Sequence, residues 1–474
     1  MSSRLTDVLN NAESKWGDRF YLSENGKTET FGSFAGKVRA LAAYLCDNGY
    51  SGQRVAVFSP NSIAWTIIDI AVTAYVGISV GFPKDWLADE FEHAVEKHDV
   101  RCIFYSETLL HIVNEIRPHF PNVRFISIEN ELDSCIAAGE KITAPALNEK
   151  TDDEAAKIVF TSGSTAYPKA VLLSIKNMFS GVEEIKKRAP LNERDVCYFF
   201  LPLSHTYGAI YNFLYSLVFG YCVYFAQSIK TMAQEMAQIH PTAFSAVPIV
   251  YTRFMYAADE LHIPIKMLLG GNIRYLFCGG AKLPEQLRAR YAAEGIELRN
   301  AYALSETASA FSIDYPGETD VDSVGTVFDN IDVRVLDPDD DGFGELIVKG
   351  ENVFLGYDND EQVTKAAFTD DGYFKTGDIG AIVNGRVHLR GRKDIMLTLP
   401  NGENVSPKAV SQKLITFYPN IRSVKIYMRD DRLLFDVYID DSPIAPTSDE
   451  LLNILPKSSR PSEIRFLSAL LLLK

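Results

Sequence analysis

Short apolar runs alternate with longer amphipathic stretches through the first two thirds of the chain. The runs are rich in β-branched and aromatic residues and have the length of buried strands; they are RVAVFS (54–59), CIFYS (102–106), VRFISI (123–128), KIVFTS (157–162), CVYFA (222–226) and RYLFCG (274–279). Between them, residues 34–48 and 61–75 have the periodicity of helices. Strands that alternate with helices predict an α/β fold with largely parallel sheets.

From about Asp332 the pattern changes to short strands that are separated by Asp and Gly turns. These strands are VRVLD (333–337), GELIVKG (344–350) and the two halves of GAIVNGRVHLRG (380–391). After Arg392 a small α/β segment follows, with VKIYMR (424–429) and LLFDVYI (433–439) as its expected strands. We therefore expect a large N-terminal domain over residues 1–391, with two α/β sheet subdomains and a β-rich subdomain. A small, mobile C-terminal α/β domain is expected over residues 392–474.

Composition and charge narrow the class of partner. The formal net charge of −15 argues against a nucleic-acid backbone or an anionic membrane surface as the main partner. The six cysteines show no C-x-x-C pair and the eight histidines form no cluster, which argues against a zinc site or a disulfide framework. The N-terminus shows no apolar signal-peptide core. These features predict a cytoplasmic protein with reduced thiols.

One segment, residues 207–226 (YGAIYNFLYSLVFGYCVYFA), has the length and apolar character of a membrane span. Gly220 divides it, however, and its second half is rich in aromatic and β-branched residues. We therefore expect a buried helix that ends near Phe219 and a buried strand from about Tyr221, and no membrane span.

The strongest chemical signal is KIVFTSGSTAYPKAVLLS (157–174), in which an expected strand runs into a loop of small polar residues. Small residues let backbone N–H groups reach phosphate oxygens, hydroxyls add donors, and a lysine adds positive charge for the outer phosphates. The loop lacks the G-x-x-x-x-G-K-[ST] order of a Walker A motif. On composition alone, a phosphate site and a polar surface turn are equal alternatives. The candidate phosphate-binding residues are Thr161, Ser162, Gly163, Ser164, Thr165 and Lys169.

TSGSTAYPKAV (161–171) resembles the phosphate-binding signature of the adenylate-forming superfamily. This superfamily includes acyl- and aryl-CoA synthetases, peptide-synthetase adenylation domains and luciferases. The usual form is [ST]-S-G-[ST]-T-G-x-P-K-G, so Ala166 and Ala170 replace glycines. If Ala166 must adopt positive φ, the change costs on the order of 1 kcal/mol. Further segments resemble signatures of this family in the same order, and together they cover most of the chain.

Two of these segments concern the acyl and adenine groups. LPLSHTYG (201–208) resembles the segment whose histidine lies by the acyl pocket, which implies that role for His205; a buried, hydrogen-bonded histidine is the alternative. FCGGAKLP (277–284) resembles the G-G-A turn beside the adenine, and a plain strand-to-loop turn is the alternative. The residues implied at the adenine are Gly279, Gly280 and Ala281.

NAYALSETAS (300–309) resembles the Y-G-x-[ST]-E-T motif, with Ala303 in place of the usual glycine. The resemblance implies that Tyr302 stacks on the adenine, that Ser305 faces the α-phosphate and that Glu306 holds Mg²⁺. A carboxylate suits a hard cation that bridges phosphates, although such an acid alone is more often a solvated residue at a helix start.

Two segments imply a ribose site and a hinge. GYFKTGDIG (372–380) resembles the T-G-D motif, so Asp378 would accept hydrogen bonds from the ribose hydroxyls; a β-turn acid is the alternative. HLRGRKDIMLTLPNGENVSP (388–407) resembles the interdomain segment of acyl-CoA synthetases, with a solvated hairpin turn as the alternative. There Arg392 would contact the ribose, and Asp394 or Lys393 would be the hinge. GELIVKGENVFLGY (344–357) is a lesser match to which no role is assigned.

The small C-terminal domain of this family carries a G-K near its end, whose lysine contacts the carboxylate and the α-phosphate. The last residues, RPSEIRFLSALLLLK (460–474), resemble the run before that motif. We expect the lysine to fall beyond Lys474, in a longer chain, or to be missing from a naturally short one; replacement by Lys474 itself is the least favoured alternative. Loss of such a cation costs about 3 kcal/mol of transition-state stabilisation.

The resemblance implies ATP-dependent activation of a carboxylic acid, in which the carboxylate attacks the α-phosphate of ATP and pyrophosphate leaves. ATP and Mg²⁺ are the implied cofactors, and the acyl group then passes to coenzyme A or to the phosphopantetheine of an acyl carrier protein. The implied catalytic residues are Lys169, Glu306, His205 and Thr165.

The substrate and the class of protein leave alternatives open. No aspartate stands near His205 to hold an ammonium group, which favours a simple acyl or aryl acid over an α-amino acid. The motifs look most like those of acyl-CoA synthetases, including enzymes of fatty acid metabolism. The other classes are a luciferase-like oxidoreductase, a nucleotide-binding pseudoenzyme, and an α/β phosphate-binding protein with chance matches.

Overall fold

The computed structural model of the chain describes residues 3–161, 167–281, 283–308, 310–318, 320, 322–393, 397–398, 404–405, 407–429, 432–440, 446–455 and 460–468. The chain divides into two compact units. Unit 1 comprises Met1–Asp332 and Val348–Phe374, and unit 2 comprises Val333–Ile347 and Lys375–Lys474. The predicted domain boundary after residue 391 stays a prediction.

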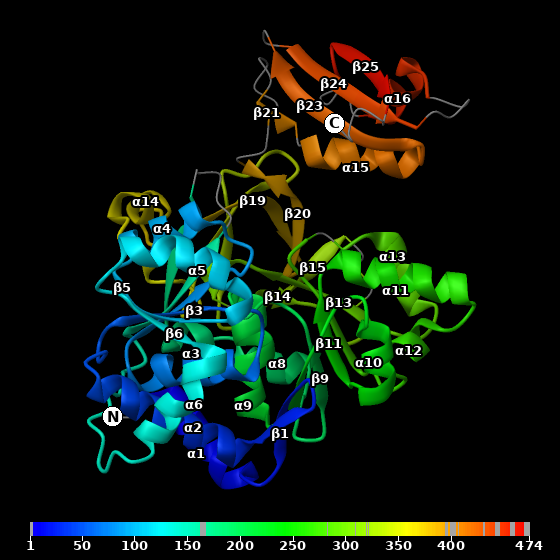
Figure 1. Cartoon of the computed structure of the whole chain (residues 1–474). Helices are drawn as coiled ribbons and strands as arrows, with labels where there is room; N and C mark the ends of the chain where they lie inside the picture. The colour runs from blue at the N-terminus through cyan, green and yellow to red at the C-terminus, as the bar shows by residue number, and fades with distance from the viewer. Residues whose placement is uncertain are drawn as a thin grey trace. The chain divides into compact units, whose positions relative to one another are not determined.

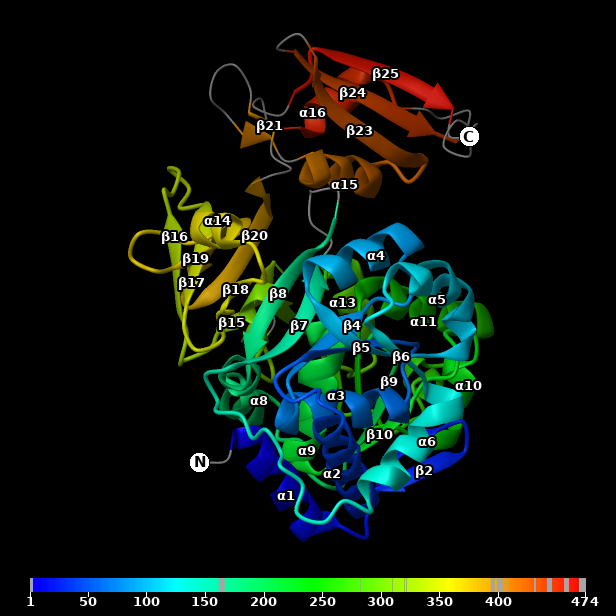
Figure 2. The same ribbon diagram turned by 60° about the vertical axis from the view of Figure 1, so that its left-hand side comes forward.

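The first sheet of unit 1 has the strand order β18-β8-β7-β4-β3-β5-β6, and Figure 1 labels its strands β3, β5 and β6. Strands β3, β4, β5, β6 and β7 are parallel, and β8 and β18 are antiparallel to their neighbours (Figure 2). The bounds are β3 Arg54–Phe58, β4 Ile78–Phe82, β5 Val100–Tyr105, β6 Arg124–Ser127, β7 Ala155–Thr161, β8 Lys169–Ser174 and β18 Gly356–Tyr357. The antiparallel pair β7–β8 brackets the loop that is rich in serine and glycine.

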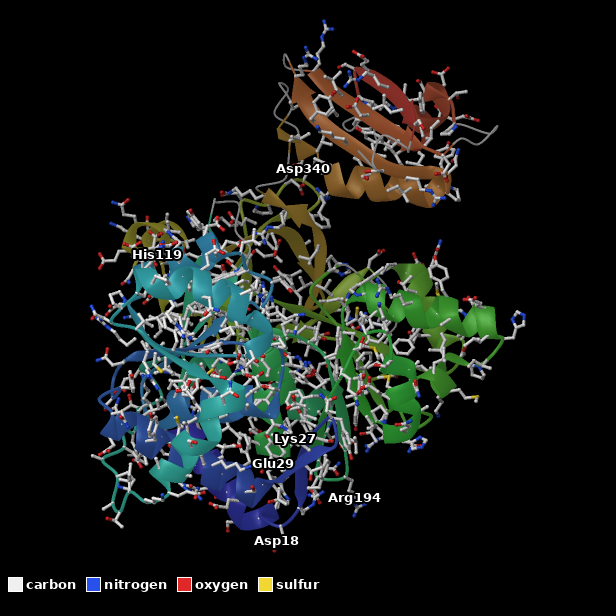
Figure 3. All side chains as sticks on the ribbon, in the orientation of Figure 1. Asp18, Lys27, Glu29, His119, Arg194 and Asp340 are labelled. Atoms are coloured by element: carbon white, nitrogen blue, oxygen red, sulfur yellow. The ribbon has the colours of Figure 1, made fainter. Side chains whose placement is uncertain are left out.

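The second sheet of unit 1 has the strand order β15-β14-β13-β12-β11-β9-β10-β1-β2. Strands β1, β10, β9, β11, β12 and β13 are parallel, whereas β2, β14 and β15 are antiparallel to their neighbours. The outermost strand β2 carries the charged residues Lys27 and Glu29 (Figure 3), which discourage pairing with another chain. The bounds are β1 Phe20–Glu24, β2 Lys27–Thr30, β9 Val196–Phe199, β10 Cys222–Phe225, β11 Ala243–Ala246, β12 Tyr275–Cys278, β13 Leu298–Ala303, β14 Ala310–Ile313 and β15 Ser323–Val327.

The helices of unit 1 pack on and between these sheets. Their bounds are α1 Arg4–Trp16, α2 Phe31–Asp47, α3 Ile63–Tyr75, α4 Ala88–Lys97, η1 Glu107–Leu109, α5 Leu110–Ile116, η2 Arg117–His119, α6 Ile128–Gly139, α7 Ile175–Phe179, α8 Val182–Arg188, η3 Tyr207–Leu214, α9 Tyr215–Phe219, α10 Met232–Ile239, α11 Pro248–Leu261, α12 Ile265–Leu268, α13 Glu285–Ala292, η4 Ser305–Thr307 and α14 Glu361–Ala366. The predicted helices at 34–48 and 61–75 correspond to α2 and α3, and both begin at a hydroxyl cap, Thr30 and Ser62.

The core of unit 1 explains the apolar character of its helices. Helix α3 contacts β3, β4 and β7 of the first sheet and β1 of the second, so its sequence is apolar all round. Phe91 of α4 and Val113 of α5 belong to one apolar cluster with β3, β4 and β5. Tyr251 of α11 and Leu287 of α13 belong to another with β11 and β12. The apolar runs identified in the sequence correspond to strands, and the predicted α/β fold with largely parallel sheets is confirmed.

The long apolar segment at residues 207–226 folds as predicted. The π-helix η3 continues into α9, and β10 follows. Gly220 ends the helix in the left-handed conformation, with φ of 76°, and its N–H donates to Ser216 O at 2.8 Å. None of the helices in the described ranges is both long and apolar enough to cross a membrane.

Replacing Gly220 by alanine is expected to destabilise unit 1. Positive φ strains any residue with a side chain, and a Cβ atom would come within 2.4 Å of Trp16 Cζ2. We expect the free energy of unfolding, measured by urea denaturation, to fall by about 2 kcal/mol. Gly26→Ala is the matched control, because Gly26 also has positive φ (81°) but no atom within 4 Å of the added Cβ. An equal loss for both variants would contradict the role of the Trp16 contact.

Unit 2 contains a small sheet and a separate α/β element. In the sheet, β16, β17, β19 and β20 lie in this order, and β19 is antiparallel to β20. In the second element, β24 pairs antiparallel with β23 and parallel with β25, and Leu414, Phe435 and Leu451 form its core. The bounds are β16 Asp332–Leu336, β17 Gly344–Lys349, β19 Phe374–Val383, β20 Arg386–Arg392, β21 Leu397–Thr398, β22 Asn404–Val405, α15 Pro407–Phe417, β23 Ile421–Arg429, β24 Arg432–Ile439, α16 Ser448–Ile454 and β25 Glu463–Ser468. These strands match those predicted from Asp332 onward.

Candidate functional site

The serine- and glycine-rich loop connects two antiparallel strands. β7 ends at Thr161 and β8 begins at Lys169, and these two residues are partners in the register. Residues 162–166 lie outside the described residues. They comprise the predicted phosphate-binding residues Ser162, Gly163, Ser164 and Thr165, and Ala166, which replaces a glycine of the family pattern. Lys169 is half-buried and follows directly from the paired strands. Ala170 lies in β8, in extended backbone that any residue adopts.

Lys169 and Glu306 both contact Tyr357. Lys169 Nζ lies 5.0 Å from the centroid of the Tyr357 ring, and the Tyr357 hydroxyl donates a hydrogen bond of 2.8 Å to Glu306 Oε1. Glu306 is half-buried in η4, which contacts β7. The Phe354 N–H donates to Glu306 O at 2.8 Å, so the segment that carries Tyr357 also fixes the backbone of Glu306. The structure thus brings together two charged residues that were predicted for the phosphate site.

Tyr302 and Ser305 precede Glu306 in the same segment. β13 ends at Ala303 in extended backbone, and the Leu304 N–H then donates to Thr307 Oγ1 at 3.0 Å, which closes the turn into η4. The ring of Tyr302 is buried and packs against Phe311, with 4.6 Å between the ring centroids. The predicted stacking of Tyr302 on adenine stays a prediction.

The G-G-A turn passes close to a tyrosine from the histidine segment. Gly280 has φ of +77°, and a Cβ on Gly279 would come within 3.3 Å of both Tyr207 Cε1 and Ala301 O. The Tyr207 hydroxyl donates to Phe277 O at 3.1 Å. The turn at Gly279, Gly280 and Ala281 therefore lies beside both β13, which carries Tyr302, and the segment that carries His205.

His205 lies in the loop between β9 and η3. Asn61 holds this loop, because its Oδ1 accepts the Leu203 N–H at 2.9 Å and its Nδ2 donates to Leu201 O at 2.8 Å. The His205 side chain is exposed, which does not fit the alternative of a buried structural histidine. Desolvation by the surrounding protein nevertheless lowers the pKa of His205 below its ordinary value. The lowered pKa favours the neutral form of this imidazole.

Unit 2 brings its own predicted residues together. Asp378 and Arg392 are partners in the β19–β20 register, with 3.5 Å between Arg392 Nη1 and Asp378 Oδ1. Glu345 fixes the backbone on one side of Asp378, because its Oε1 accepts the Gly377 N–H at 3.1 Å. Glu345 Oε2 also pairs with Lys393 Nζ at 2.8 Å. Lys393 is one of the two predicted hinge residues; the other, Asp394, lies outside the described residues.

Sequence reasoning missed three residues that organise these clusters. Tyr357 and Glu345 both belong to GELIVKGENVFLGY, whose resemblance to the family was the available signal, although it assigned no role to either residue. Asn61 gave no such signal, because an asparagine before a helical segment is expected as a turn residue. Its side chain instead reaches a loop 140 residues away in the sequence.

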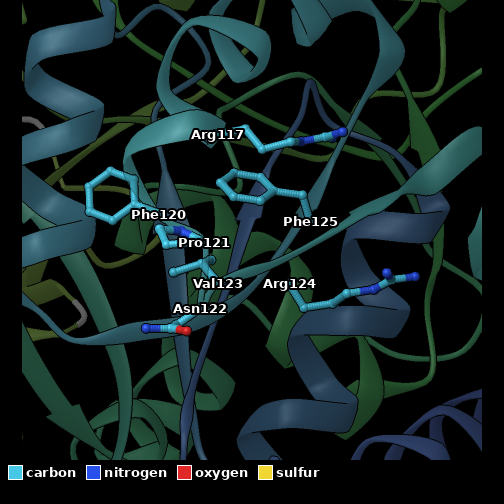
Figure 4. Close-up of a pocket in the computed structure, with 7 residues that line it drawn as sticks. All are labelled: Arg117, Phe120, Pro121, Asn122, Val123, Arg124 and Phe125. Carbon is cyan, nitrogen blue, oxygen red and sulfur yellow. The ribbon is translucent and has the colours of Figure 1, made fainter.

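A surface cavity of about 410 Å³ lies elsewhere in unit 1 and contains none of the motif residues. It is formed at the start of β6 by Arg117 and residues 120–125, with Arg117 beside the ring of Phe125 (Figure 4). Arg124 is already paired, since its Nη2 lies 2.8 Å from Glu131 Oε1. The cavity contains no carboxylate or histidine among its lining residues, so we place the chemistry at the motif clusters.

The carboxylate donors near the phosphate loop decide whether a metal ion fits this chain. Among the residues that the structure describes, no group of three or more His, Cys, Asp or Glu side chains could hold a metal ion. Glu306 offers one half-buried carboxylate beside Lys169 and Tyr357. Mg²⁺ commonly binds to one or two carboxylates and takes its other ligands from substrate phosphates and water. A single carboxylate therefore fits Mg²⁺ that arrives with a nucleotide.

Comparison with known proteins identifies the family. Residues 9–358 match the family described as AMP-binding enzyme, and the chain belongs to this family. The chain is 26% identical over 441 residues to a long-chain-fatty-acid–CoA ligase of Mycobacterium bovis, with 80% of this chain and 72% of the relative covered. It is 29% identical over 458 residues to a mitochondrial malonate–CoA ligase of Mus musculus, with 87% and 77% covered.

Solved structures share the fold. The crystal structure of ATP-bound MatB from Rhodopseudomonas palustris superposes with a TM-score of 0.84 at 22% identity, over 98% of this chain and 95% of that one. The O-succinylbenzoate–CoA synthetase of Bacillus subtilis in complex with AMP gives 0.81 at 20% identity, over 97% and 94%. The predicted resemblance to the adenylate-forming superfamily is confirmed. The predicted reaction class, ATP-dependent ligation of a carboxylic acid to a thiol, is confirmed with it.

Proposed function

We propose that this chain converts a monocarboxylic acid and ATP to an acyl-adenylate in the cytoplasm, and then passes the acyl group to coenzyme A. The observation that supports the site most directly is that Lys169, at the start of β8 in the β7–β8 hairpin, and Glu306 both contact Tyr357. A cation for the outer phosphates and a carboxylate for Mg²⁺ lie there, at the end of a loop that is rich in hydroxyl and N–H donors. The phosphopantetheine of an acyl carrier protein is the alternative acceptor.

The first half-reaction needs no nucleophile from the protein. The substrate carboxylate attacks the α-phosphorus of ATP in line, the bond to the bridging oxygen breaks, and pyrophosphate leaves with that oxygen. The Lys169 ammonium stabilises negative charge on the phosphates, and Glu306 would hold Mg²⁺, which supplies further positive charge across the phosphates. Ser305 and the hydroxyl and backbone N–H groups of the loop donate to phosphate oxygens. The loop residues in this role are Thr161, Ser162, Gly163, Ser164 and Thr165.

The remaining motif residues bind the adenosine and change its surroundings between the half-reactions. Tyr302 stacks on the adenine, and the turn at Gly279, Gly280 and Ala281 lies beside it. Asp378 accepts hydrogen bonds from the ribose hydroxyls and Arg392 donates to them. Lys393 or Asp394 acts as the hinge between domains at 1–391 and 392–474.

The charge state of His205 bears on the kind of acid. The lowered pKa of His205 favours an imidazole that offers no positive charge to a second carboxylate, so we propose a monocarboxylic acid as the substrate class. The resemblance to a long-chain-fatty-acid–CoA ligase supports a role in fatty acid metabolism, whereas the malonate–CoA ligase represents the competing dicarboxylic class.

The test is the release of pyrophosphate by the purified chain with ATP and Mg²⁺. The acids are acetate, octanoate, palmitate, benzoate and malonate, and mixtures without acid or with EDTA serve as controls. Release with one or more monocarboxylic acids, followed by thioester formation on addition of coenzyme A, is expected. Release with malonate alone would contradict the substrate class, and release with none of the acids would contradict the proposed activity. Thioester formation with a phosphopantetheinylated carrier protein but not with coenzyme A would reassign the acceptor.

A further inference from the structure

Tyr357 lies between two groups of opposite charge. Its hydroxyl donates to the Glu306 carboxylate, and the Lys169 ammonium lies over its ring at a distance typical of a cation–π contact. We propose that Tyr357 is a positioning residue of the phosphate site, which holds Glu306 for the metal ion and Lys169 for the phosphates. This inference rests on the proposed function, because it assigns a role at the same site.

A neutral aromatic residue suits this position for an electrostatic reason. A lysine and a glutamate that pair directly neutralise each other, and the pair must break before either group can bind a ligand. Tyr357 contacts each group through its hydroxyl or its ring, so it orients both groups while their charges stay available. The side chain is almost completely buried, with 9% of its surface exposed, which reduces competition from water for both contacts.

The backbone of Tyr357 is held by the strand that begins with Lys169. Tyr357 is the register partner of Val171 in the β18–β8 pair (Figure 2). The Asp358 N–H donates to Ala170 O at 2.8 Å, and the Tyr357 N–H donates to Thr364 Oγ1 at 2.8 Å. Because β8 carries both Lys169 and the partner of Tyr357, the distance between these two side chains is set by a single pair of strands.

The next residue fixes the strand from the opposite side. Asp358 is buried, and its Oδ1 accepts from Arg54 Nη2 while its Oδ2 pairs with His98 Nδ1, both at 2.8 Å. Side chains alternate along extended backbone, so this buried carboxylate leaves Tyr357 directed toward Glu306. The two contacts of Tyr357 are therefore fixed by the fold before any nucleotide binds.

The two contacts are separable by substitution. Tyr357→Phe removes the hydrogen bond to Glu306 and keeps the ring for Lys169, whereas Tyr357→Leu removes both. We expect Y357F to raise the Mg²⁺ concentration for half-maximal ATP binding about tenfold, with ATP affinity in EDTA unchanged. Y357L should in addition weaken ATP binding in EDTA about fivefold. Both quantities are measured by calorimetry, without turnover.

A matched control separates positioning from general stability. Tyr373 is also buried, and its hydroxyl donates to a carboxylate oxygen, Asp332 Oδ2; neither residue has an assigned role in nucleotide or metal binding. Tyr373→Phe should lower the melting temperature by about as much as Y357F and leave the Mg²⁺ requirement unchanged.

The outcomes distinguish this inference from the proposed function. A Mg²⁺ requirement in Y357F equal to that of the wild-type chain, or an equal shift in Y373F, would overturn the inference alone. A second result would also overturn the inference. If added Mg²⁺ restores ATP binding in neither variant, and Y357F also loses ATP affinity in EDTA, then Tyr357 has only a structural role. If the wild-type chain binds no ATP with Mg²⁺ present, the proposed function fails and the inference fails with it.

Discussion

Replacing Lys169 by alanine is expected to lower the rate of pyrophosphate release at least about a hundredfold, equivalent to about 3 kcal/mol of transition-state stabilisation. The ammonium group lies at the end of the phosphate loop, where negative charge gathers as pyrophosphate leaves. Folding should change little, because Lys169 is half-buried at the start of a strand and its Nζ packs on one ring. The rate is measured with the preferred acid at saturating ATP, and the free energy of unfolding with urea.

Lys349→Ala provides the control for this substitution. Lys349 Nζ also lies over a tyrosine, 5.2 Å from the centroid of the Tyr373 ring, and donates to Asp371 O at 2.9 Å. Lys349 therefore makes the same kind of cation–π contact but does not border the phosphate loop. The rate of pyrophosphate release by Lys349→Ala should stay within about twofold of the wild-type value. A loss below about threefold in Lys169→Ala would show that this lysine does not serve the transferred phosphate.

Replacing Asp358 by alanine is expected to destabilise unit 1 by about 3 kcal/mol or more, because it leaves the buried His98 and the partly buried Arg54 without their carboxylate. The side chain of His98 is 2% exposed and that of Asp358 is 4% exposed, so water cannot replace the lost contacts. The free energy of unfolding is measured by urea denaturation at pH 7. Asp259→Ala is the control, since the pair of Asp259 with Arg290 at 2.9 Å is largely exposed and should contribute less than about 1 kcal/mol.

This contribution should depend on pH in a defined direction. Burial alone would raise the pKa of Asp358, but the hydrogen bonds from His98 and Arg54 outweigh it and lower the pKa. Because the folded-state pKa is below the unfolded value of about 3.9, the carboxylate stabilises the fold above that pH. The stabilisation is lost as the pH falls through the folded-state pKa. The difference between the wild-type chain and D358A should therefore shrink below about pH 4; a difference that stays constant from pH 7 to pH 3 would contradict this account.

Most of the fold follows from local patterns in the sequence. Strands such as β3 and β12 are short runs of apolar residues between polar turns, and α3 shows the all-round apolar character of a helix between two sheets. The segment at 207–226 was predictable because glycine at position 220 provides the positive φ that ends a helix. These signals act over a few residues and need no knowledge of tertiary contacts.

The meeting of side chains at the site did not follow from such patterns. Tyr357 and Glu306 are 51 positions apart, and β18 has two residues, which is too short for any alternation to indicate its register. Motif resemblance placed Lys169 and Glu306 in one site, but the residue between them depends on the pairing of β18 with β8. The same holds for Glu345, whose contacts with Gly377 and Lys393 depend on the neighbouring strands of unit 2.

The alternation of Tyr357 and Asp358 limits how the loop before them can change in length. One of these neighbours faces Lys169 and Glu306, and the other faces Arg54 and His98. A shift of one residue moves every side chain of a strand to the opposite face. Deleting one residue from 350–355 would place the Asp358 carboxylate beside Glu306, and inserting one would place the Tyr357 ring against Arg54. The pairing of β18 with β8 therefore constrains the number of residues in this loop.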